Sequence, residues 1–318
     1  MMTRVAGVAL ARALVLLVAV SVLVFCATEL LPSDAARTRT GGRAGAEQLE
    51  RLRAELGLDV PAWQRYLSWL AGLCRGEAGT SLVTDRPVAQ IVAERLPATL
   101  TLAGCALAVA VPLTLLLAWL VGTAAPRWRE PLSTVVTAVA AVPQVVFATG
   151  LIVVFAVVLG WLPPVSLLPA ADAPVFDVER LTLPALSLAV PAAAFGAGLL
   201  GGAVADTVRR PHVRDAVARG LPRHRVALRH VAPFLLAPAV RVLAMTGGAL
   251  VAATAVIEMM FGYAGLGELL VSSIGTRDTP VVQAVAMLAA VVVLTGSAVA
   301  DVLGAWSDQE RGGVRAPA

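Results

Sequence analysis

The chain has 318 residues, of which 58% are hydrophobic and 14% are charged, and its formal net charge is +4. Its mean hydropathy of +0.82 lies well outside the range of soluble globular proteins. All 25 residues in the lysine-plus-arginine count are Arg, so no lysine is present to serve a Walker A phosphate loop or a Schiff-base cofactor. The composition therefore excludes a soluble globular enzyme and an ordinary P-loop ATPase.

Long apolar runs recur along the chain, and each is long enough to cross a bilayer core about 30 Å thick. The runs are continuous rather than alternating, which favours membrane-spanning helices over a β-barrel. We expect an all-α, polytopic membrane protein with six spans, at about Val8–Leu31, Pro97–Val121, Leu132–Leu162, Leu181–Ala205, Ala237–Met260 and Pro280–Leu303.

The first span follows Arg4 and is interrupted near its start by Arg12. It is long for the hydrophobic region of a signal peptide, so we expect an uncleaved helix over residues 1–31, with a cleaved signal peptide as the alternative. The three cysteines do not form a pattern typical of a disulfide framework or a metal cluster.

Residues 32–95 form a polar segment with nine Arg and eight acidic residues, so its net charge is small. It contains a helical amphipathic pattern, GAEQLERLRAELGL, and then Trp63, Tyr66 and Trp69. Aromatic residues of this kind are typical of a membrane interface or a small folded extension. We expect this segment to be extracytoplasmic and to precede a membrane-spanning core over residues 96–305 and a cytoplasmic tail over 306–318.

The third and fourth spans contain features that predict how they bend and pack. Pro143 lies near the middle of the third span, where a proline kinks a helix. The fourth span holds Pro184 and Pro191 and then the small-residue run AAAFGAGLLGGA. Small residues let helix backbones approach closely, so this run predicts a face that packs against another helix.

An Arg/His-rich segment, residues 206–235, lies between the fourth and fifth spans and holds seven Arg and all three His against two acidic residues. Within it, Gly220-Leu221-Pro222 is typical of a turn, because Gly ends a helix and Pro opens the next element. The segment predicts a helix, a turn and a second helix. We interpret it as a docking site for a soluble partner; a plain topology signal is the alternative.

The docking interpretation depends on the surface of the first of these helices. Ala216, Ala218 and Gly220 would leave it flat enough to enter a cleft of another protein, and Arg214 and Arg219 would pair with acidic residues at the rim of that cleft.

The distribution of Arg predicts the orientation, because short cytoplasmic loops carry an excess of positive charge. On one side lie Arg4, Arg12, Arg127, Arg129, the seven Arg of residues 206–235, Arg311 and Arg315, and the short loops of the other side hold Arg180 and Arg277. Both termini are therefore expected to be cytoplasmic.

Glu258 lies at the outer end of the fifth span, close enough to the interface to be solvated. An ionisable residue there is often functional, and both a gate or pathway role and a solvated structural role stay open. The following FGYAGLGELLVSSIG predicts a short re-entrant or interfacial helix, whose tight turns Gly262, Gly265 and Gly267 would allow. The candidate gate residues are Glu258, Phe261, Gly265 and Gly267.

Arg277 and Asp278 are expected to cap the sixth helix.

Several of these stretches resemble one family. VRDAVARGLPRHRVALRH resembles the coupling segment of ABC-importer permeases of the dipeptide, oligopeptide and nickel family, with matches at Val213, Arg214, Ala216, Ala218, Gly220, Leu221 and His230. TDRPVAQIVAERLPATL and VIEMMFGYAGLGELLVSSIGTRDTPVVQ are similar to further family patterns in the same order, so the resemblance covers most of the chain. The chain departs from the family pattern at Gly201, Asp206, His212, Pro233, Phe234 and Ala264, which leaves the substrate open.

The resemblance implies a type I ABC-importer permease fold and a transmembrane permease subunit of an ATP-driven importer for peptides. The subunit would form the translocation pathway in the inner membrane and would be neither an enzyme nor a cofactor-binding protein. The implied partners are cytoplasmic ATPase subunits, a second homologous permease, an extracytoplasmic substrate-binding protein and membrane lipid, with no nucleic acid. The implied ATPase contacts are Val213, Arg214, Asp215, Ala216, Ala218, Arg219, Gly220 and Leu221.

Two alternatives come from other classes. An ion-coupled secondary transporter would need carboxylates or unwound helices near the middle of the bilayer, and the predicted spans are almost free of such acidic residues. A membrane protein for signalling or assembly would use residues 206–235 to bind a different partner. The substrate and the choice between a homodimer and a heterodimer stay open.

Overall fold

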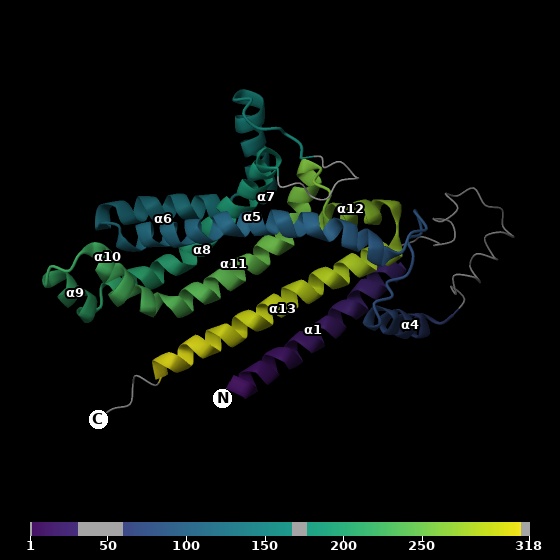
Figure 1. The fold of residues 1–318 in the computed structure, drawn as a ribbon, viewed down its shortest axis with the longest axis horizontal. Helices are drawn as coiled ribbons and strands as arrows, with labels where there is room; N and C mark the ends of the chain where they lie inside the picture. Colours follow the sequence, from purple (N-terminus) through teal and green to yellow (C-terminus); the bar gives the residue numbers. More distant parts are fainter. Residues whose placement is uncertain (1, 31–59, 167–176, 313–318) are drawn as a thin grey trace.

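The computed structural model describes residues 2–30, 60–166 and 177–312, with side chains described at 7–29, 60–166, 177–299 and 301–302. The predicted pattern GAEQLERLRAELGL and the last residues of the predicted tail lie outside these ranges. Every named element in the described ranges is a helix, which confirms the predicted all-α class. The long helices run roughly side by side as one elongated bundle (Figure 1).

Five helices are long and apolar enough to cross a membrane. They lie within α1 (Met2–Leu30), α5 (Val88–Thr123), α8 (Val178–Val208), the continuous helix that ends as α11 (Ala232–Phe261), and α13 (Thr279–Gly312). The second predicted span begins earlier than expected, because Pro97 and Pro112 both lie inside α5. A helix in a membrane accommodates an internal proline when neighbouring helices satisfy the freed backbone groups.

The predicted third span is broken into two helices. α6 (Pro126–Ala141) and the helix formed by α7 (Gln144–Leu151) and the π-helical η1 (Ile152–Val158) are bent by 98° relative to each other. Pro143 has no N–H to continue the helix, and the preceding Val142 is extended at φ −66° and ψ 126°. Pro143 therefore causes a break rather than the expected kink, and α7 projects sideways from the bundle (Figure 1).

α8 lies at the centre of the bundle and packs along α5. A Cβ atom added at Gly122 would lie 2.5 Å from a methyl carbon of Val204, and one added at Gly196 would lie 2.9 Å from a methyl carbon of Thr114. Neither position has room for a side chain without movement. The small-residue run of the fourth span therefore packs closely against another helix, as predicted.

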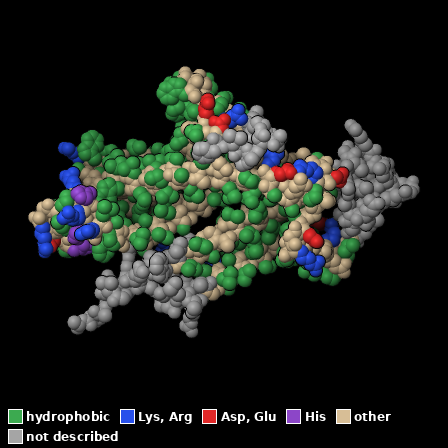
Figure 2. Space-filling view, in the orientation of Figure 1, with side chains coloured by type: hydrophobic (Ala, Val, Ile, Leu, Met, Phe, Trp, Pro, Cys, Tyr) green, Lys and Arg blue, Asp and Glu red, His purple; other side chains and the backbone are tan. Residues whose placement is uncertain are grey.

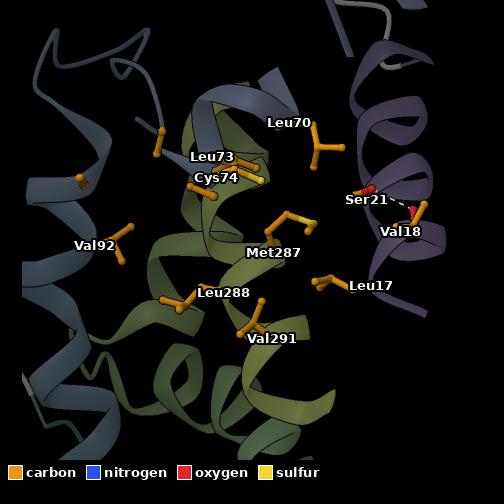
Figure 3. A pocket seen from close by; sticks show the side chains of 13 residues that line it. Leu17, Val18, Ser21, Leu70, Leu73, Cys74, Val92, Met287, Leu288 and Val291 are labelled. Carbon is orange, nitrogen blue, oxygen red and sulfur yellow. Dashed lines mark hydrogen bonds between the residues drawn. The ribbon is translucent and has the colours of Figure 1, made fainter. Parts of the chain in front are cut away.

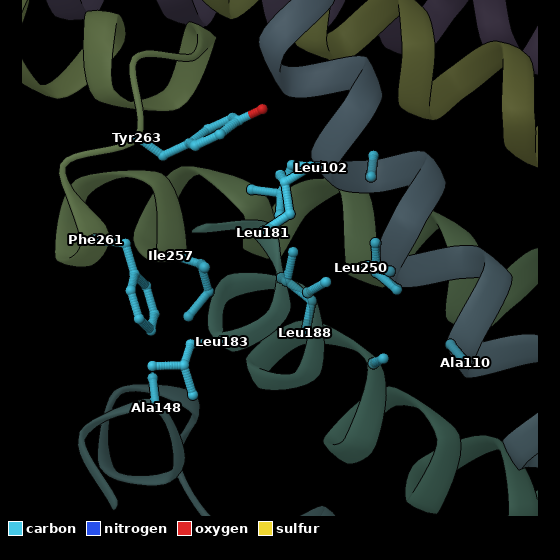
Figure 4. Close-up of a cluster of buried hydrophobic side chains, with 14 of the residues drawn as sticks. Leu102, Ala110, Ala148, Leu181, Leu183, Leu188, Leu250, Ile257, Phe261 and Tyr263 are labelled. Atoms are coloured by element: carbon cyan, nitrogen blue, oxygen red, sulfur yellow. The ribbon is translucent and has the colours of Figure 1, made fainter. Parts of the chain in front are cut away.

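Beyond the close contact of α5 and α8, a cluster of buried apolar side chains extends towards the end of the bundle that carries α12 (Leu266–Thr276). Leu102 of α5, Leu188 of α8, and Ile257 and Phe261 of α11 belong to it and are buried (Figure 4). α5, α8 and α11 thus form a three-helix core.

α1 and α13 pack against each other as an antiparallel pair beside this core (Figure 1). The buried Gln283 amide donates to Thr28 Oγ1 at 2.8 Å, and Arg12 pairs with Asp301 at 3.5 Å towards the other end of the two helices. α4 (Ala62–Cys74) lies against α1, with the ring of Tyr66 5.4 Å from that of Phe25. The aromatic stretch, for which the sequence favours a membrane interface or a small folded extension, is a helix packed on the first span.

Gly122→Ala should lower the stability of the bundle, because the added methyl group meets Val204. Overpacking of this kind typically costs about 1–3 kcal/mol. Thermal unfolding in detergent, followed by size-exclusion chromatography, should show a lower Tm than for the wild type. Gly104→Ala is the matched control, because it lies on the same helix with nothing within 4 Å of the added atom. An equal Tm for the two variants would contradict this account of the α5–α8 contact.

Candidate functional site

The two predicted sites lie at opposite ends of the bundle. α9 (Pro211–Ala218), α10 (Arg223–Val226) and the π-helical η2 (Ala227–Val231) form the basic end, where Arg and His side chains gather on the surface (Figures 1 and 2). We call the other end, which carries α12, α4 and the loop at residues 80–87, the far end.

The basic end is a helix, a turn and a second helix, as the sequence predicts. Pro211 opens α9, and Gly220 after the helix has a φ of +74°, a left-handed conformation that suits glycine. The Leu221 N–H then donates to the Ala216 carbonyl at 3.3 Å. The second helix is short and continues through η2 into α11, so one side of the turn is the beginning of the fifth span.

One face of α9 packs against the chain itself. Val213 is 2% exposed and Ala216 is 3% exposed, and both belong to an apolar cluster with Val226 and Val231. This corrects the expectation that Ala216 contributes to a flat outer surface. Val213 and Ala216 instead attach α9 to the beginning of the fifth span.

The outer face of α9 carries a different set of residues. Val217 is 60% exposed. Asp215 and Arg219, on the same exposed side, pair at 2.7 Å. Arg214 and Ala218 are also exposed. The surface available to a partner therefore combines one apolar side chain with a few charged ones.

Aromatic and histidine contacts hold the beginning of α9 in place. The His212 ring lies 4.8 Å from the Phe234 ring, and its Nε2 is 3.2 Å from the His230 carbonyl oxygen. The Arg210 guanidinium carbon lies 5.1 Å from the centre of the Phe234 ring, a cation–π contact. His212 and Phe234, both departures from the family pattern, thus contact each other and join α9 to α11.

At the far end, Glu258 is completely buried, which corrects the expectation that it is solvated. One carboxylate oxygen accepts from Thr99 Oγ1 at 2.7 Å. The other accepts from the backbone N–H of Gly267 at 2.6 Å and of Glu268 at 3.3 Å. Thr99 Oγ1 also accepts from the N–H of Leu266 at 2.8 Å. Together these groups satisfy the otherwise unpaired first N–H groups of α12.

We call this arrangement of Glu258, Thr99 and the first turn of α12 the α12 latch. It joins α5, α11 and α12 through buried hydrogen bonds to a carboxylate, which are stronger than bonds between neutral groups. Thr99 is not among the residues predicted from the sequence. The only available signal was its place in RLPATL, a stretch used there only for the family resemblance.

The glycines around the latch serve two purposes. Gly262 has a φ of +61° and ends α11, as predicted. A Cβ atom at Gly265 would lie 2.3 Å from the Glu258 carboxyl carbon, and one at Gly267 would lie 2.1 Å from Ala255 Cα. Gly265 and Gly267 are therefore required by close approach rather than by a left-handed turn. Phe261, the fourth candidate gate residue, is buried in the apolar core.

Other contacts strengthen the far end. The Tyr263 hydroxyl donates to the Ala98 carbonyl at 3.0 Å, and burial raises the pKa of Tyr263 to about 12, so this donor stays protonated. The Asp278 carboxylate accepts from the Ser81 hydroxyl and, at 3.1 Å, from the Leu82 N–H. Asp278 directly precedes α13, and its carbonyl accepts from the Val282 N–H at 3.0 Å, which agrees with the predicted cap of the sixth helix. Its carboxylate in addition binds the 80–87 loop.

No group of three or more His, Cys, Asp and Glu side chains that could hold a metal ion occurs within the described ranges. The functional groups at both ends engage in packing and hydrogen bonding.

Comparison with known proteins gives consistent matches. Residues 110–312 match the family described as "Binding-protein-dependent transport system inner membrane component". Residues 2–103 match the family that describes the N-terminal part of such membrane components. The glutathione transport system permease protein GsiC of Escherichia coli strain K12 is 34% identical over 286 residues, covering 89% of this chain and 90% of the relative. A "Putative peptide transport system permease protein" of Brucella melitensis is 30% identical over 305 residues, covering 95% and 96%.

Glu258→Ala should loosen α12, because two backbone N–H groups and the Thr99 hydroxyl lose their acceptor. A buried donor left without a partner costs about 1–3 kcal/mol. Hydrogen exchange of residues 266–270 should therefore become about tenfold faster or more. Glu268→Gln is the control, because it removes the charge that pairs with Arg95 at 3.4 Å, a contact between side chains that are about one-third exposed. Unchanged exchange in Glu258→Ala would show that α12 does not depend on the latch.

Proposed function

The chain belongs to the family of binding-protein-dependent transport system inner membrane components, and from this premise we propose how it works. It is a transmembrane permease subunit of an ABC importer. Its membrane helices form part of the translocation pathway, and ATP hydrolysis takes place on separate ATPase subunits. The proposal rests above all on the exposed face of α9, because this helix is attached directly to two long membrane-crossing helices.

In our proposal a cytoplasmic ATPase subunit receives α9 in a cleft. Val217 enters the cleft as the apolar contact, and Arg214 pairs with acidic residues at its rim. Val213 and Ala216 face the other way and hold α9 to the chain's own helices. Movement of the ATPase would then displace α8, which ends directly before α9, and α11, which follows η2.

The far end responds to this displacement through the α12 latch. α11 runs from the basic end to Glu258, and Glu258 binds the first turn of α12 and Thr99 of α5. A displacement of α11 therefore moves α12 together with α5. We propose that the far end is extracytoplasmic, that both termini are cytoplasmic, and that α12 lies at the mouth where a substrate-binding protein delivers its cargo.

We propose short peptides as the substrate. The names of the two relatives support this, since one concerns glutathione, which is a tripeptide, and the other concerns peptides. A second homologous permease would complete the pathway. The family's description, binding-protein-dependent transport, argues against an ion-coupled mechanism. The carboxylate of Glu258, the most deeply buried acid of the far end, is also fully occupied by hydrogen bonds.

Val217→Glu should abolish copurification of the ATPase with the tagged permease, because the substitution places a carboxylate in the apolar contact. A buried unpaired charge costs several kcal/mol. Val217 is a better test site than Gly220, whose positive φ would strain any substituted residue. Val83→Glu is the control, because Val83 is also about half exposed but lies at the far end. Retention of the ATPase by Val217→Glu, with a normal elution profile, would exclude α9 as the docking helix.

Transport is tested by reconstituting the permeases, the ATPase subunits and the binding protein in liposomes. ATP-dependent uptake of a radiolabelled tripeptide is expected for the wild type and should be lost in Val217→Glu. Unlabelled dipeptides, glutathione and a nickel chelate are then compared as competitors. Competition by the nickel chelate alone would overturn the proposal of peptides while leaving the permease function intact.

A further inference from the structure

A cavity of about 480 Å³ lies between α1, α4, the beginning of α5 and α13 (Figure 3). Its volume falls within the range of about 300–1,000 Å³ that is typical of small-molecule sites. It is separate from the basic end and from the α12 latch, and neither the fold nor the proposed transport function assigns it a role.

The walls of this cavity are apolar. They are formed by Leu17, Val18 and Ser21 of α1, Leu70, Leu73 and Cys74 of α4, Ala78, Ala89 and Val92 near the beginning of α5, and Ala284, Met287, Leu288 and Val291 of α13. The one side-chain hydroxyl, on Ser21, is already bonded to the Val18 carbonyl at 2.8 Å and to the Tyr66 hydroxyl at 2.8 Å. A water molecule in such a cavity would lack the polar partners that it needs, so the cavity suits a hydrocarbon chain.

The position of the cavity indicates where that hydrocarbon comes from. Three walls belong to membrane-spanning segments, Gly7–Glu29, Val88–Thr123 and Thr279–Val299. At the rim, Val18 is 55% exposed and Val291 is 43% exposed. Apolar side chains exposed on spanning helices face the acyl chains of the bilayer. The cavity therefore opens onto lipid, in the half of the bilayer nearer the far end.

The residue that follows the last lining residue of α4 in the sequence is positively charged. Cys74 is the last residue of α4 and lines the cavity, and Arg75 follows it directly and is exposed. Arg75 forms no ion pair within the described ranges. An Arg beside a hydrocarbon site is suited to a phosphate group, which its guanidinium can bind with two parallel hydrogen bonds.

We propose that this cavity holds one acyl chain of a phospholipid, with the phosphate of the same molecule bound near Arg75. The lipid fills the space between α1 and α5, which the side chains of the two helices leave open. It thereby joins the peripheral pair of α1 and α13 to the core and supports α4 against the bundle.

The test uses the full chain in vesicles of phosphatidylethanolamine and phosphatidylglycerol that contain a phosphatidylglycerol with a photoreactive diazirine in one acyl chain. After illumination, mass spectrometry locates the adducts. The expected result is an adduct on the peptides that contain residues 70–74 and 284–291, with the mass of the intact phospholipid. An adduct with the mass of a free fatty acid would contradict the assignment to a phospholipid.

Ala284→Phe should fill the cavity and reduce the adduct about tenfold, which corresponds to about 1.4 kcal/mol of binding free energy. Val292→Phe is the matched control, because it lies on the same helix, is 44% exposed and does not line the cavity. Ala89→Leu, at an exposed lining position, serves as a second filling variant if Ala284→Phe does not fold. Equal labelling in the filling variants and the control would overturn the proposal.

The role of Arg75 is tested with Arg75→Gln. Labelling by the phospholipid should fall, whereas labelling by a diacylglycerol that carries the same diazirine should not change. An equal effect on both compounds would exclude phosphate recognition. A third result would identify a different occupant. This result is the absence of a lipid adduct in the wild type together with a link from Cys74 to residues 31–59 by a short bifunctional reagent. It would mean that residues 31–59 occupy the cavity in place of a lipid, and it would overturn the proposal.

Discussion

The close approach of α5 and α8 determines where the other parts of the bundle lie, because hydrocarbon surroundings give helices no hydrophobic reason to associate. Gly122 against Val204 and Gly196 against Thr114 bring the two backbones together and allow dispersion contacts along their length. α9 follows the end of α8, and Thr99 of the α12 latch lies on α5. Both ends of the bundle are therefore attached to the same central contact.

The two ends are held by different physical interactions. At the basic end, a small apolar cluster that includes Val213 and Ala216 fixes α9, and the charged side chains remain outside in water. At the far end, the carboxylate of Glu258 is withdrawn from solvent and is satisfied entirely by donors from Thr99 and α12. A buried carboxylate without these donors would be costly, so α11 and α12 are held in a fixed relation.

The periphery is looser than this core. α1 and α13 form a pair of their own, joined by Gln283 and Thr28 and by Arg12 and Asp301. A cavity separates part of this pair from α5. A lipid chain in that cavity would make the contact between core and periphery depend on the membrane. The permease would then contain a rigid path between its ends and a lateral region that adapts to its surroundings.

The sequence by itself determined the all-α class, the approximate spans and the turn at Gly220, because the length of an apolar run and the conformation of turn residues are local properties. It also determined the family, through motifs that can be read along the chain. It also indicated that the small residues of α8 pack closely. Only the tertiary structure decided that Ala216 faces inward, that Pro143 breaks a helix by 98°, and that Glu258 is buried. Thr99, one partner of Glu258, and Ser81, one partner of Asp278, lie more than 150 residues away along the chain. Local patterns carry no information about such contacts, since these depend on how the separate helices come together.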